Sequence, residues 1–265
     1  MKNRIDKERF GPWAIITGAS SGIGKEFARQ LAAVGLNLVL VARRIALLEE
    51  IGKQLEKEFA IQYRTVETDL ALESSIEKIA RATIDLDIGL LISNAGTGRP
   101  GRFLSFDEMD LKYILQLNAA SHLSLTHYFG KRMAIRGKGG VLLTGAMGAV
   151  DGVPYMANEA GTKGYILSLG KSLHTEFKEA GLNITVLVTS PTETPVLGLL
   201  GFNKDNIPMK PISTQQCVRE ALAALNANRI TVLPGLRYRI MNALIPGPVA
   251  REMTGKIIKK NNRIV

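Results

Sequence analysis

The sequence predicts an α/β fold in which a parallel β-sheet is covered by helices on both sides. First, short and continuously apolar runs alternate with longer segments of helical spacing, as expected of strands buried on both faces. Second, a glycine-rich turn joins the first apolar run to the first helical segment. Third, 265 residues with 46% hydrophobic and 22% charged side chains suit one soluble domain with a sizeable core.

Seven β-branched or apolar runs are expected to be strands: 13–17, 36–42, 61–66, 89–93, 141–144, 184–189 and 230–233. Six segments between them have the spacing of helices: 22–34, 44–59, 73–84, 107–135, 155–180 and 214–226. Residues 236–258 add apolar side chains at helical spacing, with a break at Pro246-Gly247-Pro248. Residues 191–212, rich in proline and glycine, are expected to be irregular, either as a mobile loop over a substrate site or as a plain surface loop.

Composition narrows the functional classes. A single cysteine, Cys217, excludes an internal disulfide, and three histidines without a cysteine cluster argue against a metal site. No apolar run approaches the length of a membrane span, and residues 1–8 are charged and lack the apolar stretch of a secretory signal. A cytoplasmic protein is therefore expected.

Positive charge is concentrated near the C-terminus. The net charge is +10, and residues 229–265 carry eight Lys or Arg against one acid, Glu252, which makes +7. Residues 236–265 therefore form a basic amphipathic extension. Weak contact with an anionic membrane surface is one interpretation, and a solvated tail that aids solubility is the simpler one; no nucleic-acid partner is expected.

The glycine-rich turn predicts a dinucleotide site. Glycines allow the backbone to turn tightly and approach a ligand, and the helix that follows offers free N–H groups to a pyrophosphate. The strand–turn–helix context is the one that this interpretation requires. The residues expected to contact the cofactor here are Gly18, Ser20, Ser21, Gly22, Ile23 and Gly24.

Arginines follow the second strand, where an NAD-binding fold usually places an acid for the ribose hydroxyls. Arg43 suits a 2′-phosphate instead, and Ser20 could donate to the same phosphate, so the expected cofactor is NADP(H). The alternative for Arg43 and Arg44 is a solvent-facing helix start. Asp69 and Leu70 end the third strand, where the carboxylate could accept from the adenine amino group or cap a helix.

Asn94-Ala95-Gly96 ends the fourth strand. Small residues at this point allow the backbone to lie against the cofactor. The Asn94 side chain could alternatively tie neighbouring strands together.

These motifs, together with Leu167-Ser168-Leu169, resemble the short-chain dehydrogenase/reductase family of the compact bacterial type, in order and over essentially the whole chain. The resemblance implies a single doubly wound Rossmann domain with seven parallel strands, assembled as a homodimer or homotetramer. It also implies hydride transfer between a nicotinamide and a carbonyl or hydroxyl. In this family a serine, a tyrosine, a lysine and an asparagine carry the chemistry.

Two of those four positions match. Lys163 falls at the lysine, which holds the nicotinamide ribose, and Asn118 falls at the asparagine, which shapes a kink and anchors a proton-relay water. Glu159 stands where the tyrosine is expected, four residues before Lys163, and Ala146 stands where the serine is expected. Thr194 matches a threonine that can contact the carboxamide.

The departures change the expected chemistry. Ala146 cannot donate a hydrogen bond to a carbonyl. Glu159 and Lys163 are one helical turn apart and can pair; the lysine favours the carboxylate, burial favours the neutral acid, and the sequence does not decide between them. Because general acid–base help contributes roughly 10²–10⁴-fold, the usual reductase rate is expected to be heavily reduced.

Other side chains could take over the roles of the serine and the tyrosine. Tyr155 is expected to share a helical face with Glu159, and Thr144 lies on the same strand face as Ala146, although packing is the simpler role for both. The three histidines, His122, His127 and His174, are expected on helix surfaces or in the core. Three hypotheses remain open: an NADP-dependent oxidoreductase with altered residues, a nucleotide-binding sensor or scaffold without turnover, and a non-redox acid/base enzyme that uses Glu159.

Overall fold

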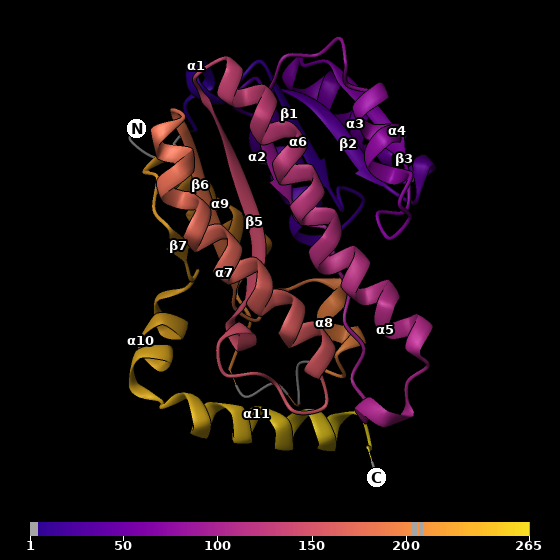
Figure 1. The fold of residues 1–265 in the computed structure, drawn as a ribbon, viewed down its shortest axis with the longest axis vertical. Helices are drawn as coiled ribbons and strands as arrows, with labels where there is room; N and C mark the ends of the chain where they lie inside the picture. The colour runs from indigo at the N-terminus through magenta and orange to yellow at the C-terminus, as the bar shows by residue number, and fades with distance from the viewer. Residues whose placement is uncertain (1–4, 203–205, 207–208, 265) are drawn as a thin grey trace.

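A computed structural model describes residues 5–202, 206 and 209–264, and Pro208 of the predicted irregular region lies outside them. Its centre is a seven-stranded sheet in the order β3-β2-β1-β4-β5-β6-β7, and every neighbouring pair is parallel (Figure 1). The strands are β1 Trp13–Thr17, β2 Asn37–Ala42, β3 Tyr63–Glu67, β4 Ile88–Ser93, β5 Gly139–Ala146, β6 Leu182–Thr189 and β7 Thr231–Val232. The predicted seven-stranded parallel sheet is confirmed.

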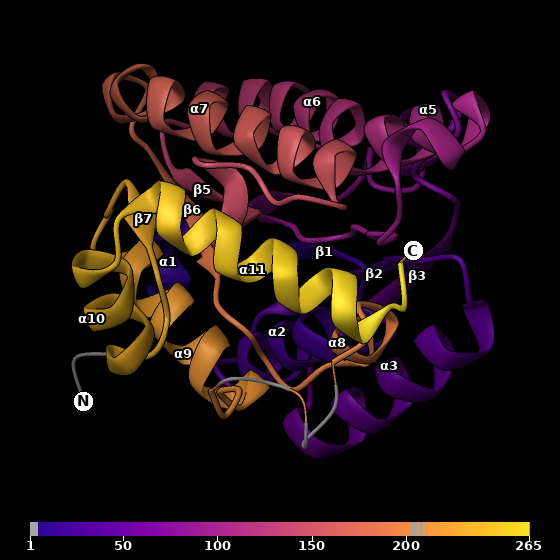
Figure 2. The same ribbon diagram turned by 90° about the horizontal axis from the view of Figure 1, so that it is seen from below.

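Helices cover both faces of the sheet (Figure 2). One face carries α2 Gly22–Ala32, α3 Ile45–Phe59 and α9 Thr214–Asn226; the other carries α5 Glu108–Leu115, α6 Ser121–Ile135 and α7 Ala157–Glu179. The short helix α4 Ser75–Arg81 packs beside α6 on this second face. Each face has its own apolar core, the first built around Phe27, Leu31 and Leu48 and the second around Ile79, Phe129 and Ile166. The short helices are α1 Lys7–Phe10, η1 Phe103–Ser105, η3 Met147–Ala149 and α8 Pro195–Leu199.

The strand order reverses beside β1. The chain winds outward from β1 to β3, then returns to place β4 on the other side of β1. In an open parallel sheet this reversal leaves a crevice at the carboxyl ends of the strands, which is where ligands bind. The glycine-rich turn after β1 and Asn94 after β4 therefore lie at the same edge of the sheet.

Two predicted helices differ from the structure. The segment 107–135 is interrupted by a π-helical turn, η2 Gln116–Ala120, and the helix predicted over 155–180 begins only at Ala157. A π-helical turn has no signature in apolar spacing, because the extra residue shifts the register by only one position. Within 191–212, α8 forms and Thr192 pairs with Ile212 in an isolated bridge.

The C-terminal extension forms two helices, α10 Leu236–Leu244 and α11 Gly247–Asn261. In Figures 1 and 2, α11 lies across the end of the molecule where α7 begins and α8 is found. The side chain of Asn262 donates to the carbonyl oxygen of Leu200 (3.0 Å), and Gly255 packs against Pro154. The last helix thus spans the edge of the sheet that carries the crevice.

Candidate active site

The backbone of the glycine-rich turn favours or requires glycine at Gly18, Gly22 and Gly24. Gly18 and Gly22 adopt left-handed backbone angles, with φ of +69° and +54°. A Cβ at Gly24 would overlap the carbonyl oxygen of Gly18, so only glycine allows α2 to start this close to the turn. Ser21 occupies the N-cap of α2 without a side-chain cap bond. The first turn of α2 can therefore present its N–H groups to an anion.

Arg44 reaches the same turn. Its guanidinium donates to the hydroxyl oxygen of Ser20 (2.8 Å) and to that of Ser21 (3.3 Å). A guanidinium beside two hydroxyls offers several donors to a phosphate monoester. From the sequence, Arg43 was predicted to contact the cofactor and Arg44 was not. Arg44 follows the end of β2 as the N-cap of α3, so the alternation of side chains along a strand does not fix its direction.

Arg43 belongs to a second cluster. Its guanidinium donates to the hydroxyl oxygen of Tyr113 in α5 (2.9 Å), and Tyr113 donates in turn to the Asp69 carboxylate (3.0 Å). Asp69 also accepts from the backbone N–H of Ala71 (3.0 Å) in the turn after β3, and it is not a helix cap, because Ser74 is the N-cap of α4. Leu70 is buried and belongs to the second apolar core. Tyr113 was missed by the sequence analysis, since its position on a helix carried no motif.

Asn94 ties two strands together. Its side-chain amide donates to the backbone carbonyl of Thr17 (3.1 Å), and its backbone N–H donates to the Thr17 hydroxyl (2.8 Å). The N–H of Ala95 donates to the same hydroxyl (3.0 Å). The structure thus has the strand-tying arrangement, which fixes the backbone that leads to Gly96.

His122 supports the same segment from within the core. It is fully buried, its Nε2 donates to the carbonyl of Ala95 (2.8 Å), and its Nδ1 accepts from the Ser93 hydroxyl (2.9 Å). Burial, together with a smaller effect of the nearby Lys163, lowers the pKa of His122 to about 3. The expectation of a core role for this histidine is confirmed. His127 is exposed on α6, and His174 bonds to a backbone carbonyl away from the crevice.

Asn118 lies in the π-helical turn η2 and is fully buried. Its side-chain oxygen accepts from the N–H of Thr97 (2.9 Å), and its side-chain nitrogen donates to the carbonyl of Thr97 (2.7 Å). The amide thus pairs with both backbone groups of one residue in the segment after β4. The kink expected at Asn118 is present, and it holds that segment against α7.

Lys163 is buried in α7. Its Nζ donates to the backbone carbonyl of Thr144 in β5 (2.9 Å), and burial lowers its pKa while Glu159 raises it. A Cβ at Gly96 would lie 3.2 Å from this Nζ and 3.1 Å from the side-chain oxygen of Asn118. Gly96 therefore keeps open the space between the lysine and the asparagine.

Glu159 lies one turn before Lys163 without a direct ion pair or hydrogen bond between them, although Lys163 lowers the pKa of Glu159, the direction that the sequence predicted. Its Oε2 is buried without a hydrogen-bond partner. Burial raises the pKa of Glu159 to about 7, and Lys163 only partly offsets this effect. The structure thus answers what the sequence left open: burial outweighs the lysine, and the carboxyl group is populated in both protonation states near neutral pH.

Ala146, Thr144 and Tyr155 lie near Glu159, and their positions show whether they could take over the roles of the expected serine and tyrosine. Ala146 ends β5 beside Thr189 of β6 and brings no side-chain donor. Thr144 holds Lys163 by its carbonyl, and its hydroxyl donates weakly to Asn94 (3.4 Å), which is a packing role. Tyr155 precedes α7 in a left-handed conformation with φ of +65°, so it does not share a helical face with Glu159 as expected.

A cavity of about 460 Å³ opens beside Glu159. Apolar and aromatic side chains make up much of its wall, with two arginines among them. Its main lining residues are Arg99, Arg102, Phe103, Phe106, Leu111, Ile114, Tyr155 and Met156. A bulky apolar molecule would fit beside the Glu159 carboxyl group.

Thr194 closes the other side of the crevice. It is the N-cap of α8, and its methyl group lies 3.2 Å from where a Cβ of Gly22 would stand. The structure thus brings Thr194 to the glycine-rich turn, although the two are far apart in sequence. Thr194, the glycine-rich turn and the segment after β4 therefore lie at the same edge of the sheet.

With this geometry in place, the family can be stated. A family model for short chain dehydrogenases matches residues 12–202, and the chain belongs to that family. A very-long-chain 3-oxoacyl-CoA reductase of Neurospora crassa is 34% identical over 229 residues, which cover 84% of this chain and 68% of that protein. A 7beta-hydroxysteroid dehydrogenase of Mediterraneibacter gnavus is 28% identical over 236 residues, which cover 88% of this chain and 89% of the relative.

Solved structures agree with the fold and the cofactor. A short-chain dehydrogenase from Sphingobium yanoikuyae in complex with NADPH superimposes with a TM-score of 0.79 at 26% identity, over 88% of this chain and 93% of the other. This agrees with the NADP(H) cofactor that the sequence predicts. In the described part of the chain, no helix combines the length and apolar character that a membrane span needs.

Proposed function

We propose that this protein is an NADP(H)-dependent oxidoreductase for a carbonyl or hydroxyl substrate, in which Glu159 replaces the tyrosine as proton donor and acceptor. One observation carries the proposal: the Glu159 carboxyl group has a buried oxygen without a hydrogen-bond partner and a pKa raised to about 7. A group with this pKa can give and take a proton at neutral pH, which is what the reaction requires in its two directions.

The cofactor would be held by parts of the chain that fit it. The first turn of α2 would hold the pyrophosphate, and Arg44 with Ser20 and Ser21 would hold the 2′-phosphate. Lys163 and Asn118 flank the space that Gly96 leaves open, where the nicotinamide ribose belongs in this family. The bound cofactor supplies or accepts the hydride.

The protein supplies the proton. In reduction, neutral Glu159 donates its proton to the carbonyl oxygen as the hydride reaches the carbonyl carbon, and the products are an alcohol, oxidised cofactor and a Glu159 carboxylate. The buried positive charge of Lys163 stabilises that carboxylate, since it is the one influence that lowers the pKa of Glu159. Ala146 gives no polarising hydrogen bond, so the rate stays below that of a relative with the usual serine.

The cavity supports a substrate with a bulky apolar body. Its wall beside Glu159 is largely aromatic and aliphatic. The names of both relatives, a very-long-chain 3-oxoacyl-CoA reductase and a 7beta-hydroxysteroid dehydrogenase, point to large apolar substrates as well. We therefore place the hydroxysteroid and long-chain 3-oxoacyl classes first among the candidates. Residues 191–212 are proposed to cover such a substrate.

A second candidate is a nucleotide-binding protein without redox turnover. The absence of any side-chain donor at Ala146 favours it. A third candidate is non-redox acid/base chemistry by Glu159 beside a structural dinucleotide. All three retain NADP(H) binding, so binding alone does not separate them.

A measurement of turnover distinguishes the three candidate functions. NADPH consumption is measured by absorbance with a panel of steroid and long-chain ketones, for the native protein, Ala146→Ser, Glu159→Tyr and the double variant. The proposal predicts native turnover, which rises in Ala146→Ser. Activity found only in the double variant would favour the binding-only candidate, and proton exchange on a substrate without NADPH consumption would favour the third.

A cytoplasmic location and a homodimer or homotetramer are further proposals that rest on composition and on the family. Sedimentation velocity of the full chain tests the assembly: a single species of monomer mass would reject it.

A further inference from the structure

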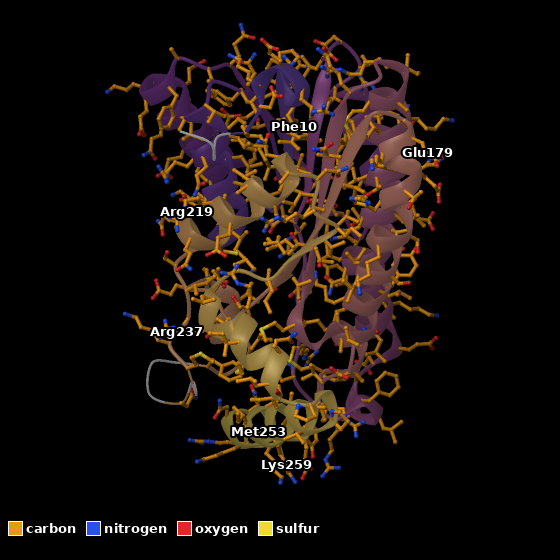
Figure 3. The ribbon with its side chains drawn as sticks, turned by 90° about the vertical axis from the view of Figure 1, so that its left-hand side faces the viewer. Phe10, Glu179, Arg219, Arg237, Met253 and Lys259 are labelled. Atoms are coloured by element: carbon orange, nitrogen blue, oxygen red, sulfur yellow. The ribbon has the colours of Figure 1, made fainter. Side chains whose placement is uncertain are left out.

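The outer side of α11 combines exposed apolar and basic side chains. Val249 is 48% exposed and Met253 50%, and Leu244, just before the helix, is 76% exposed. Lys256, Lys259 and Lys260 are exposed on the following turns. We call these six residues the C-terminal face. Figure 3 shows Met253 and Lys259 at the lower edge of the molecule.

The inner side of the same helix is fixed to the protein. Gly255 and Ile258 are buried, and a Cβ at Gly255 would lie only 2.8 Å from Pro154. Asn262, directly after the helix, donates to the carbonyl of Leu200. The outer side chains are therefore held outward on a docked helix, and they do not belong to a loose tail.

Charge on this face is strongly one-sided. Within the described part of α11 and the residues that follow it, the only acid is Glu252, which pairs with Lys256 at 2.8 Å. Lys259 and Lys260 stand in the last turn with Arg263 close behind. An interface with a second copy of the chain through this face would bring like charges together, which is unfavourable.

We propose that the C-terminal face binds the surface of an anionic lipid bilayer. The apolar side chains Leu244, Val249 and Met253 would enter the headgroup region, and the lysines would contact anionic headgroups. A nucleic acid would attract the lysines but would offer no apolar phase to Leu244, Val249 and Met253. Because α11 spans the crevice edge, docking also turns the mouth of the active site toward the membrane.

The test is co-sedimentation of the full chain with vesicles of phosphatidylcholine alone or with phosphatidylserine added. We expect binding to the anionic vesicles only, weakened by salt. Lys259→Gln with Lys260→Gln should weaken this binding on the order of tenfold or more, since each basic side chain near an anionic surface contributes substantially. The matched control is Lys53→Gln with Lys131→Gln, which removes the same charge from exposed positions on α3 and α6 and should leave binding nearly unchanged.

A second pair of variants tests the apolar part. Val249→Asn with Met253→Asn keeps the charge and should also weaken vesicle binding, while circular dichroism and NADPH binding report that the fold is intact. Equal binding to both kinds of vesicle, equal losses in the lysine pair and its control, or no effect of the asparagine pair would each overturn the proposal. So would a dimer that the asparagine pair dissociates, or binding to a DNA duplex that competes with the vesicles.

Discussion

The carboxyl group of Glu159 occupies the space that a side chain at residue 98 would fill. A Cβ built on Gly98 overlaps Glu159 Oε2, and the next two nearest atoms belong to the same carboxyl group. The backbone after β4 and the first turn of α7 thus meet without a side chain between them. Gly98 is what allows the Glu159 carboxyl group to be buried at this position.

Gly98→Ala should therefore displace the Glu159 carboxyl group. Because a shift on the order of 1 Å in a reacting group can lower a rate about 10²-fold, we expect kcat to fall by one to two orders of magnitude. The measurement is steady-state NADPH consumption with the best ketone of the panel.

Gly161→Ala is the matched control. Gly161 lies in α7, the helix that carries Glu159, and a Cβ at this position would meet no atom within 4 Å. Since alanine has the higher helix propensity, this variant should be stabilised by roughly 0.5–1 kcal/mol with its activity kept. If both variants lose activity alike, Gly98 has no special relation to Glu159.

Arg44→Ala should weaken NADPH binding by about 10–100-fold and change NADH binding little. The reason is that Arg44 is bonded to Ser20 and Ser21, and a hydrogen bond to a charged group is worth about 1.5–3 kcal/mol. Arg43→Ala should also weaken NADPH more than NADH, by a smaller factor, because that side chain is 68% exposed and already bonded to Tyr113. Fluorescence titration with both cofactors measures this, and equal effects on the two would reject the assigned phosphate site.

His122 should make the fold sensitive to acid. Its pKa is about 3 in the folded protein and near 6.5 when unfolded. Below pH 6.5 the unfolded chain binds a proton that the folded protein does not, so stability falls as the pH falls toward 3, by at most about 1.4 kcal/mol per pH unit. Urea unfolding at pH 7 and pH 5 should show the native protein losing about 2 kcal/mol more than His122→Gln. Identical losses would mean that the histidine is not buried neutral.

Glu159 should make the folded protein less stable as the pH rises, which is the opposite of the effect of His122. Its pKa of about 7 lies above the unfolded value of 4.5, so the folded protein favours the neutral acid and loses stability as the pH rises from 4.5 through 7. Glu159→Gln removes this loss, and the variant should gain up to about 3 kcal/mol relative to the native protein between pH 4.5 and pH 8. A pH-independent difference between the two proteins in urea unfolding would contradict the raised pKa.

The sheet, the glycine-rich turn and the two altered positions of the site were predictable from the sequence. The apolar runs predicted the sheet because strands buried on both faces must be apolar, and the turn from Gly18 to Gly24 stood out because glycine adopts left-handed backbone angles most readily. Glu159 and Ala146 were found through the family resemblance, which places a tyrosine four residues before Lys163 and a serine thirteen residues before that tyrosine. These are local properties, which a single sequence carries.

What could not be predicted depends on contacts between distant segments. The protonation of Glu159 is set by how deeply Gly98 allows its carboxyl group to be buried, and no spacing rule relates the two. Arg44 and Tyr113 join the site through side-chain directions that apolar periodicity does not specify. Tyr155 was placed wrongly because the start of α7 depends on a left-handed residue without a glycine to mark it.

The central claim is that Glu159 transfers the proton, and the most direct test is the pH dependence of kcat/KM for carbonyl reduction in the native protein and in Glu159→Gln. The account predicts a native profile that declines above a pKa of about 7, as Glu159 loses its proton, and a variant that is roughly 10²–10⁴-fold slower with no such decline. A variant that keeps the native rate and the native profile would contradict it.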